Sequence, residues 1–362
     1  MAGQRYDTVA GQHEKFKGRV LEKARVDEML TKLGAMEEIP QNKSELIEWT
    51  RFLPYGGVDN QWIAAGGDVT FVAQHTIQEG VTPTPDSLSW TTVQATLQEI
   101  GCLYSYTNKT RYVHEKGAEI PPEMEDQLAT RMVLTREMMT YGEFKTTSNL
   151  FFGGGGSTVG TTNGVVTSTK FQDISRDIMG HHGFTVNKML GGSQNVGTTP
   201  IQPSWPVYCH SDMEKTFENM VGFVKRANYG GQYTPIDEDY EIGAIGRFRI
   251  IINPILTFMA DSGAAVGTFT GGSVGSAGKS TNGTLLDIYP LIIPGRGKGG
   301  GESFGQVALR GFNSLMVNHL PPDMKSKSDP LQQRGYVAGA TWQAQSILND
   351  DWLAVAYSAC EA

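Results

Sequence analysis

The sequence predicts a mixed α+β fold, in which an extended two-stranded segment and one long helix precede a compact α/β region and a final set of strands. Three observations support this class. Apolar and polar residues alternate over 44–55 and 89–107, apolar residues recur at helical spacing over 121–145, and a helix–strand–helix order follows over 169–224. No internal repeat at a fixed period accompanies these patterns.

Composition excludes several broad classes of protein. The 362 residues include 30 Lys and Arg against 38 Asp and Glu, so the net charge is -8, and without a basic block we do not expect a protein that wraps nucleic acid. The 44 Gly and 16 Pro indicate many turns, whereas 15 Phe, 13 Tyr and 6 Trp are too many for a disordered chain. The N-terminus lacks an apolar signal core, and the longest apolar run, Ile255–Ala260, is too short to span a bilayer.

Residues 1–43 have the character of a charged N-terminal arm. Good helix formers with apolar residues near helical spacing fill 13–38, and Gly34 is a natural stop. Because the apolar stripe is thin, we expect a helix that leans on another surface, such as a neighbouring subunit. A partly frayed terminal helix is the alternative.

The first two strands predict an extended arm. Ile47 and Trp49 alternate with polar residues in the first strand. The apolar face of the second changes phase at Glu99, which predicts a bulge or a strand bend near Glu99–Gly101. About thirty Gly- and Pro-rich residues separate the strands, far more than the usual 2–5 of a hairpin. Such an arm cannot bury both of its faces, so we expect it to pack on another chain.

The segment 121–145 carries the strongest helix signal. Pro121-Pro122 can open the helix, and acidic residues follow at its positive end. At 1.5 Å per residue it would be about 37 Å long. The expected buried stripe consists of Met124, Leu128, Met132 and Met139, widened by Leu134, Met138 and Tyr141.

The Gly-rich loop 151–167 precedes the α/β region. We expect a helix over Thr169–Gly180 with Gly180 in the C′ position, a strand over Pro206–Cys209, and a helix over Asp212–Val224 that begins with a Ser211/Glu214 capping box.

The remaining chain predicts strands. They are expected over 242–259, near 285–293 and 306–317, and over 336–348 and 352–357, with a Gly/Ser/Thr loop at 263–283 and a turn at Asn349-Asp350-Asp351.

Short matches to enzyme motifs lack the context that their chemistry requires. Gly271-Gly272-Ser273-Val274-Gly275 has the spacing of a nucleophile elbow, but no helix is expected after it. Gly278-Lys279-Ser280 lacks the first glycine of a phosphate-binding loop, and the triplet Asp261-Ser262-Gly263 occurs once, although acid proteases need two carboxylates. We therefore expect no catalytic residues and no cofactor.

Metal-ligating residues do not form a recognisable pattern either. His181-His182 and Cys209-His210 match no zinc spacing, and the three cysteines (Cys102, Cys209 and Cys360) form no CxxC pair. We expect no metal site, and the odd, scattered cysteines indicate a reduced compartment without a disulfide framework.

The order of elements resembles the major capsid proteins of tailed bacteriophages, which have the Hong Kong 97 fold. Particular segments resemble the coat proteins of short-tailed phages of the N-four (enquatrovirus) type. These are Glu79-Gly80-Val81-Thr82-Pro83 with the strand Val93-Gln94-Ala95-Thr96-Leu97, the segment Glu241–Phe248, the segment Ser328-Asp329-Pro330-Leu331-Gln332-Gln333-Arg334, and the segment Ile347-Leu348-Asn349-Asp350-Asp351-Trp352. The similarity covers roughly residues 40–358, and the final segments are its most specific part.

The resemblance implies a domain layout. The parts are an N-arm (1–43), an extended hairpin or E-loop (44–110), a peripheral P-domain with the spine helix (111–150), an axial A-domain with inserted Gly-rich loops (151–317), and C-terminal strands that return to the P-domain (318–362). It also implies family-motif or assembly roles for Trp49, Glu79, Gly80, Leu128, Met132, Gly243, Gly246, Ser328, Asp329, Pro330, Arg334, Asn349, Asp350, Asp351 and Trp352.

The function implied is that of a structural subunit, not an enzyme. Hexamers and pentamers of the chain would form an icosahedral head in the bacterial host cytoplasm and enclose double-stranded DNA without a membrane. The partners implied are further copies of the chain, a portal, and scaffold and decoration or cement proteins. The alternatives are an encapsulin-like shell for protein cargo, which shares the fold, and a phage tail or receptor-binding β-protein, which would lack the long helix.

Overall fold

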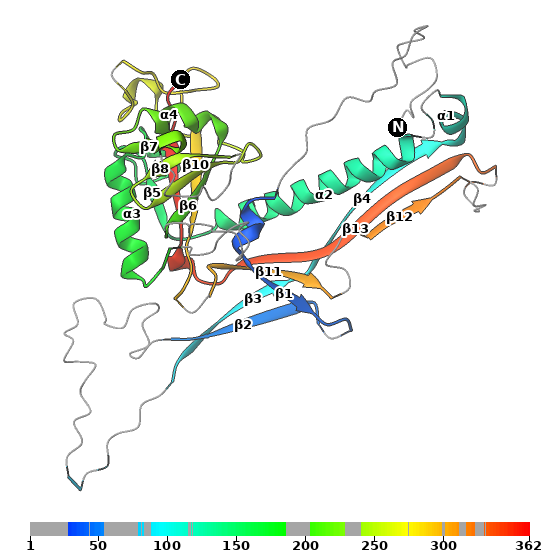
Figure 1. Ribbon diagram of the computed structural model, residues 1–362, viewed down its shortest axis with the longest axis horizontal. Helices are drawn as coiled ribbons and strands as arrows, with labels where there is room; N and C mark the ends of the chain where they lie inside the picture. Colours follow the sequence, from blue (N-terminus) through cyan, green and yellow to red (C-terminus); the bar gives the residue numbers. More distant parts are fainter. Residues whose placement is uncertain are drawn as a thin grey trace.

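The computed structural model describes residues 28–42, 44–53, 79–80, 82, 88–114, 117, 119–185, 203–228, 240–273, 275–298, 301–310, 316–322, 329 and 331–362. Two bodies and a projecting ribbon make up this part of the chain (Figure 1). One body is built on a seven-stranded sheet, and the other on a five-stranded sheet along which a long helix runs. No helix in these ranges is both long and apolar enough to cross a membrane.

The seven-stranded sheet has the order β5-β14-β10-β6-β9-β8-β7. Its strands are β5 (Leu150–Phe152), β6 (Trp205–Cys209), β7 (Phe223–Lys225), β8 (Glu241–Ile245), β9 (Phe248–Ile252), β10 (Ile288–Pro294) and β14 (Leu353–Ala359). Every residue of β6, β10 and β14 is buried, which is typical of strands covered on both faces.

Alternate residues of these strands pack into two different hydrophobic cores, one on each face of the sheet. Tyr289, Leu291 and Ile293 of β10 pack against α3 (Ser168–Gly180) through Phe171, Ile174 and Ile178. The intervening residues Ile288 and Ile292 point to the opposite face. There they meet the C-terminal end of α2 (Ile120–Phe144), which contributes Tyr141 and Phe144.

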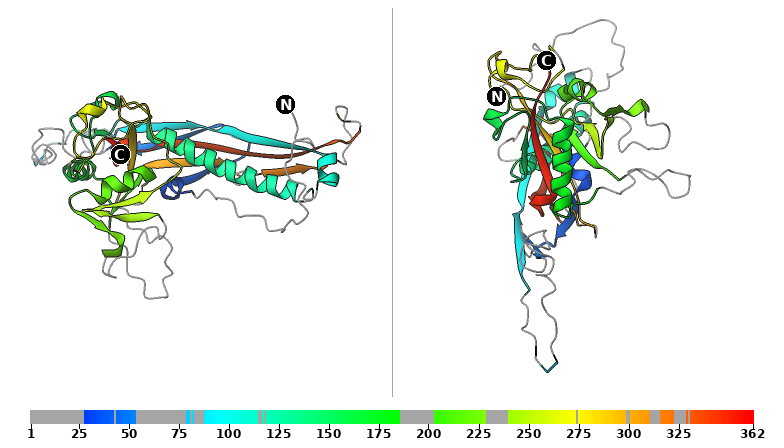
Figure 2. Two further views of the ribbon diagram at one scale, coloured as in Figure 1. Left: turned by 90° about the horizontal axis from the view of Figure 1, so that it is seen from above. Right: turned by 90° about the vertical axis from the view of Figure 1, so that its left-hand side faces the viewer.

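The five-stranded sheet is organised around β13 (Arg334–Ile347). This strand pairs with β4 (Gln98–Thr107), β12 (Met316–Leu320) and β11 (Phe304–Leu309), and β11 pairs in parallel with β1 (Ala35–Ile39). Figure 2 shows α2 lying along β4 and β13 for much of their length. Leu128 and Met132 on α2 are buried there against Tyr106 and Val337.

The helix α2 therefore belongs to both cores. Its N-terminal half packs on the five-stranded sheet, and its C-terminal half packs under the seven-stranded sheet. The helix predicted over 121–145 is confirmed to within one residue at each end. One residue of its expected buried stripe, Leu134, is exposed instead. A T-shaped contact between Phe144 and Phe304, with ring centroids 4.6 Å apart, marks the point where the bodies meet.

The two-stranded ribbon is formed by β2 (Leu46–Phe52) and β3 (Trp90–Thr96). One end packs on the five-stranded sheet through Trp49 and Ala95, and the other end projects away from it (Figure 1). The predicted phase change is confirmed. Of its two expected causes, a bulge at Glu99–Gly101 is wrong, because these residues pair regularly with β13. The chain instead leaves β2 at Leu97, whose N–H donates to the Glu45 carbonyl, and changes partner strand. This exchange of partners resets which side chains face inward.

The N-terminal prediction needs correction where it can be compared. Residues 28–38 do not form a helix. They form a 3₁₀ turn over Leu30–Leu33 and the strand β1. Gly34 does end the turn, and a Cβ at this position would lie 2.4 Å from the Phe304 ring. Residues 13–27 of the expected helix lie outside the described residues.

Three further local predictions are wrong. The helix expected over Asp212–Val224 is only α4 (Glu214–Glu218) after a 3₁₀ turn, and the cap is His210, whose Nδ1 accepts from the Asp212 N–H. Gly180 remains in α3, and the left-handed residue is His182, with φ 57°. The strand expected over 242–259 is the β8–β9 hairpin, which turns at Gly246 with φ 57°.

The domain boundaries expected at the C-terminal end also need correction. Of the strands in 318–362, β13 joins the sheet beneath α2, but β14 lies inside the seven-stranded sheet between β5 and β10. Conversely, β11 falls within the range 151–317 and pairs in the five-stranded sheet. The chain therefore crosses between the two bodies more often than the linear division predicts.

Met132→Asp tests the shared helix. The substitution places a carboxylate among Tyr106, Leu128 and Val337, and a buried charge without a partner should lower the free energy of unfolding by about 3 kcal/mol or more. Urea unfolding measures the change. The control is Leu134→Asp on the same helix, where the exposed position predicts less than about 1 kcal/mol. Equal effects of the two variants would contradict this packing.

Candidate assembly surfaces

The residues of the enzyme-like motifs are engaged in structural contacts. Ser273 donates through its N–H and its Oγ to the carboxylate of Glu361. Lys279 lies 2.6 Å from Asp212 Oδ2, and Asp261 accepts the Asn282 N–H. These contacts fasten the 263–283 loop to the sheet, and none of them provides a nucleophile with a base.

The histidines and cysteines also make structural contacts, and Cys360 lies near Asp212, with its Sγ 3.0 Å from the Asp212 carbonyl oxygen. His181 contacts Asp177, whereas His210 lies 3.4 Å from Asp212. Within the described ranges no group of His, Cys, Asp and Glu could hold a metal ion. Burial raises the pKa of the Cys209 and Cys360 thiols, so both remain protonated and poorly nucleophilic.

Glu137 is the most constrained ionisable residue of α2, and the sequence patterns did not single it out. Its side chain is fully buried, and its Oε1 accepts the N–H groups of Met29 and Leu30 at 3.0 and 2.9 Å and the Asn253 Nδ2 at 3.1 Å. Beside it, Arg136 pairs with Glu28. One carboxylate thus holds the N-terminal segment, α2 and the end of β9 together.

The C-terminal motif forms a second junction inside the subunit. Asp350 accepts the Ser148 N–H at 3.0 Å, just after the end of α2, and the Asn349 N–H donates to the Ser303 carbonyl. The Trp352 indole N–H donates to the His181 carbonyl at 2.9 Å, and a Cβ at Gly297 would lie 2.5 Å from its ring. Asp351 adjoins these residues in the same 3₁₀ turn.

The other motif residues with described positions shape turns and close contacts. The Asp329 carboxylate accepts the N–H groups of Gln333 and Arg334, both at 2.8 Å, at the start of β13. A Cβ at Gly243 would lie 2.3 Å from the Phe223 ring, so β7 and β8 need glycine there. Glu79 and Gly80 form an exposed turn with φ 81° at Gly80, while Ser328 and Pro330 lie outside the described residues.

The ribbon carries a group of exposed large apolar side chains. Phe52 and Trp90 face each other across the β2–β3 pair and are 62% and 61% exposed, and Leu88 continues the patch at 64%. Trp49 points to the other face, where it packs near Ile39 and Val307. An apolar patch on a projecting ribbon is typical of a surface that another chain covers.

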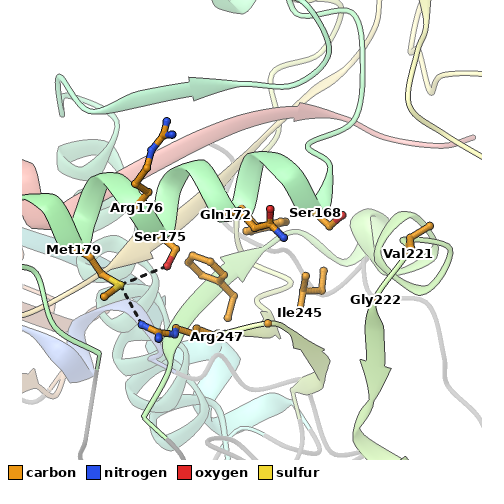
Figure 3. Close-up of a pocket in the computed structure, with 12 residues that line it drawn as sticks. Ser168, Gln172, Ser175, Arg176, Met179, Val221, Gly222, Ile245 and Arg247 are labelled. Carbon is orange, nitrogen blue, oxygen red and sulfur yellow. Dashed lines mark hydrogen bonds between the residues drawn. The ribbon is translucent and has the colours of Figure 1, made fainter.

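A groove lies at the far end of the seven-stranded body (Figure 3). It runs between α3, the turn at Val221-Gly222 and the β8–β9 turn, and it encloses about 660 Å³. The sequence patterns did not predict it, because its walls come from segments that are far apart in the chain.

Comparisons with known proteins agree on one class. No family model matches the chain. The major capsid protein of Pseudomonas phage KPP21 is 23% identical over 204 residues, which are 52% of this chain and 47% of that protein, so the match spans about half of its length. This similarity is to a phage major capsid protein, across part of each chain.

Solved phage capsids match the fold over nearly the whole chain. The capsid of Ralstonia phage GP4 has a TM-score of 0.59 at 10% identity and covers 100% of this chain and 99% of its own. The capsid of cyanophage P-SCSP1u has a TM-score of 0.58 at 10% identity, with 98% and 96% covered, and that of cyanophage Pam1 has 0.56 at 12%, with 99% of each. The chain therefore has the mixed α+β fold of phage capsid subunits.

Glu137→Ala tests the first junction. Removing the carboxylate leaves three buried donors without an acceptor, so we expect the free energy of unfolding to fall by about 3 kcal/mol or more. Limited proteolysis should also cut earlier near Lys32. Glu137→Gln is the matched control, since its amide oxygen still accepts. Equal losses in both variants would show that hydrogen bonding at this site is not what holds the segment.

The buried carboxyl group of Glu137 also makes the stability of the fold depend on pH in a definite direction. Burial raises the pKa of Glu137 above its ordinary 4.5, and the hydrogen bonds from Leu30, Met29 and Asn253 oppose this shift only in part. The folded chain therefore retains a proton that the unfolded chain loses, so the wild type gains stability relative to Glu137→Gln as the pH falls from about 8 to about 5. Urea midpoints at both pH values measure this, and a relative loss toward acid would contradict it.

Proposed function

We propose that this chain is the major capsid protein of a tailed phage, the subunit of an icosahedral head that encloses double-stranded DNA. The observation that carries the proposal is the fold, which matches phage capsids over nearly the whole chain. The partial sequence similarity to a phage major capsid protein supports the same assignment.

The elements fit the parts of the Hong Kong 97 fold. In this proposal α2 is the spine helix, the five-stranded sheet is the peripheral domain, the seven-stranded body is the axial domain, and the β2–β3 ribbon is the base of the E-loop. The N-arm is the N-terminal segment whose Met29 and Leu30 N–H groups donate to Glu137. The finer assignment to the N-four type rests on the terminal segments around Asp329 and Trp352.

Physical arguments support a shell subunit over an enzyme. The ribbon exposes Phe52, Leu88 and Trp90, which other subunits would cover. The net charge of -8 is compatible with a wall that confines DNA without adhering to it. Large interfaces between copies related by rotation would close hexamers and pentamers, so the assembly energy is spread over many contacts.

The proposed partners follow from the same role. They are further copies of the chain, a portal at one vertex, packaged DNA, and separate scaffold and cement proteins. Assembly would take place in the cytoplasm of the bacterial host, and the product would be the virion head.

Electron microscopy of the full chain tests the proposal. After expression in the bacterial cytosol and size-exclusion chromatography, we expect closed shells, or rings of five and six subunits, in the void volume. A chain that stays monomeric at every concentration, with and without a crowding agent, would contradict the proposal. A packaged enzyme or other protein cargo within the shells would favour the encapsulin-like alternative instead.

Deleting residues 56–88 separates folding from assembly. Because the deleted residues lie beyond the paired ends of the ribbon, the thermal unfolding midpoint should change by less than about 3 °C. The deletion should nevertheless abolish shells and rings in the same chromatography. Normal shells from this variant would show that the extended arm beyond the ribbon is not an element between subunits.

A further inference from the structure

His210 caps the turn that follows β6. Its Nδ1 accepts the Asp212 N–H at 3.1 Å, at the start of the 3₁₀ turn Ser211–Met213 that leads into α4. The imidazole packs against the rings of Phe258 and Tyr289, with centroids 5.7 and 5.6 Å away, and only 18% of the side chain is exposed. A ring nitrogen that accepts a hydrogen bond carries no proton, so this cap exists only while the imidazole is neutral.

Asp212 connects this turn to three other parts of the seven-stranded body. Its Oδ2 accepts from the Lys279 ammonium at 2.6 Å and from the Tyr289 hydroxyl at 2.9 Å. Its carbonyl accepts from the Cys360 thiol, whose Sγ is 3.0 Å away, and the Lys279 N–H donates to the Cys360 carbonyl at 2.9 Å. One aspartate therefore joins the turn, the 263–283 loop, β10 and the C-terminal residues.

Protonation of His210 opposes this arrangement. An imidazolium carries a proton on both nitrogens, so Nδ1 would present a donor to the Asp212 N–H. The Asp212 carboxylate is 3.4 Å from Nδ1, but it already accepts from Lys279, so a charged ring would compete with that lysine. Burial lowers the pKa of His210, and the charge of Lys279 adds to this shift while the charge of Asp212 opposes it. The closed turn therefore favours the neutral ring.

The other ionisable groups around the ring keep their charge state in mild acid. Although burial opposes it, the hydrogen bonds from Lys279 and Tyr289 hold the pKa of Asp212 below its ordinary value, so this residue stays a carboxylate. Burial raises the pKa of the Tyr289 hydroxyl and of the Cys360 thiol, so both stay protonated. Among these groups, acidification changes the charge of His210 alone.

Two other described histidines have the opposite surroundings. His181 Nδ1 lies 3.0 Å from the Asp177 carbonyl oxygen and 3.8 Å from its carboxylate. His319 Nδ1 lies 3.7 Å from Glu125 Oε1. A proton on either ring faces an acceptor, whereas a proton on His210 Nδ1 faces a donor. Acid therefore reinforces the first two contacts and weakens the third.

We propose that His210 is an acid-sensitive latch, whose protonation frees the segment 211–218 and the Lys279 end of the 263–283 loop and uncovers Cys360. The closed state binds the proton less readily than the open state does. The latch therefore holds above the ordinary histidine pKa of about 6.5 and opens as the pH falls below it. This switch is built into the single chain, so it goes beyond the proposed function and does not depend on it.

Hydrogen exchange of the full chain at about pH 7.5 and about pH 5.5 tests the latch. After division by the intrinsic exchange rates, the peptides 211–218 and 275–281 should exchange about tenfold faster in acid, since each unit by which closure lowers the His210 pKa is a factor of ten. His210→Asn should abolish the acceleration, because asparagine caps such turns and does not titrate. The matched control His181→Asn should retain it. Equal acceleration in the wild type and His210→Asn, or none in the wild type, would overturn the proposal.

Thiol labelling gives a second readout that needs no change at His210. The reagent 4,4′-dithiodipyridine reacts with thiols in acid as well as at neutral pH, and Cys102 in the other body reports its intrinsic response. Relative to Cys102, Cys360 should react faster as the pH falls. Lys279→Met removes a cation that disfavours protonation, so the midpoint of this change should move to higher pH, whereas Lys279→Arg should keep it. A midpoint that is the same in both variants, or Cys360 labelling that follows Cys102 at every pH, would contradict the latch.

Discussion

The carboxylate of Glu137 is the contact on which the arrangement of the subunit depends. It is buried where the N-terminal segment, the long helix and the end of β9 converge, and it accepts a hydrogen bond from each of Met29, Leu30 and Asn253. A buried donor that loses its acceptor is costly, and three such donors converge here. Ordering of the N-terminal segment and attachment of α2 to the seven-stranded body are therefore coupled at one residue.

The two bodies are joined by shared elements, so they behave as one rigid frame with projecting parts. The helix α2 contributes side chains to both cores. The chain passes from β13 to β14 through Asn349 and Trp352, and the hydrogen bond from the Trp352 indole to the His181 carbonyl holds this connection in place. The ribbon and the groove therefore lie on different parts of one continuous structure.

Long periodic segments were predictable from the sequence, because local pattern determines them. The helix over 121–145, the paired strands before it and the strands of the C-terminal region are found where apolar periodicity placed them. Which of the two sheets each strand joins was not predictable from the sequence. Nothing in the pattern of Leu353–Ala359 distinguishes a strand of one sheet from a strand of the other. Glu137 looked like one more charged residue on a helix, since its partners at Met29 and Asn253 are more than one hundred positions away. His182 has the left-handed conformation expected of Gly180, because Gly180 is still part of the helix and His181 is its C-cap.

Hydrogen exchange, compared between unassembled and assembled chains, tests the account most directly. A frame that forms before assembly predicts that β10 and β14 exchange slowly in both states. The ribbon peptides over 46–52 and 90–96 should become protected only in particles. Unchanged exchange in the ribbon, despite complete assembly, would contradict the claim that this surface joins one subunit to the next.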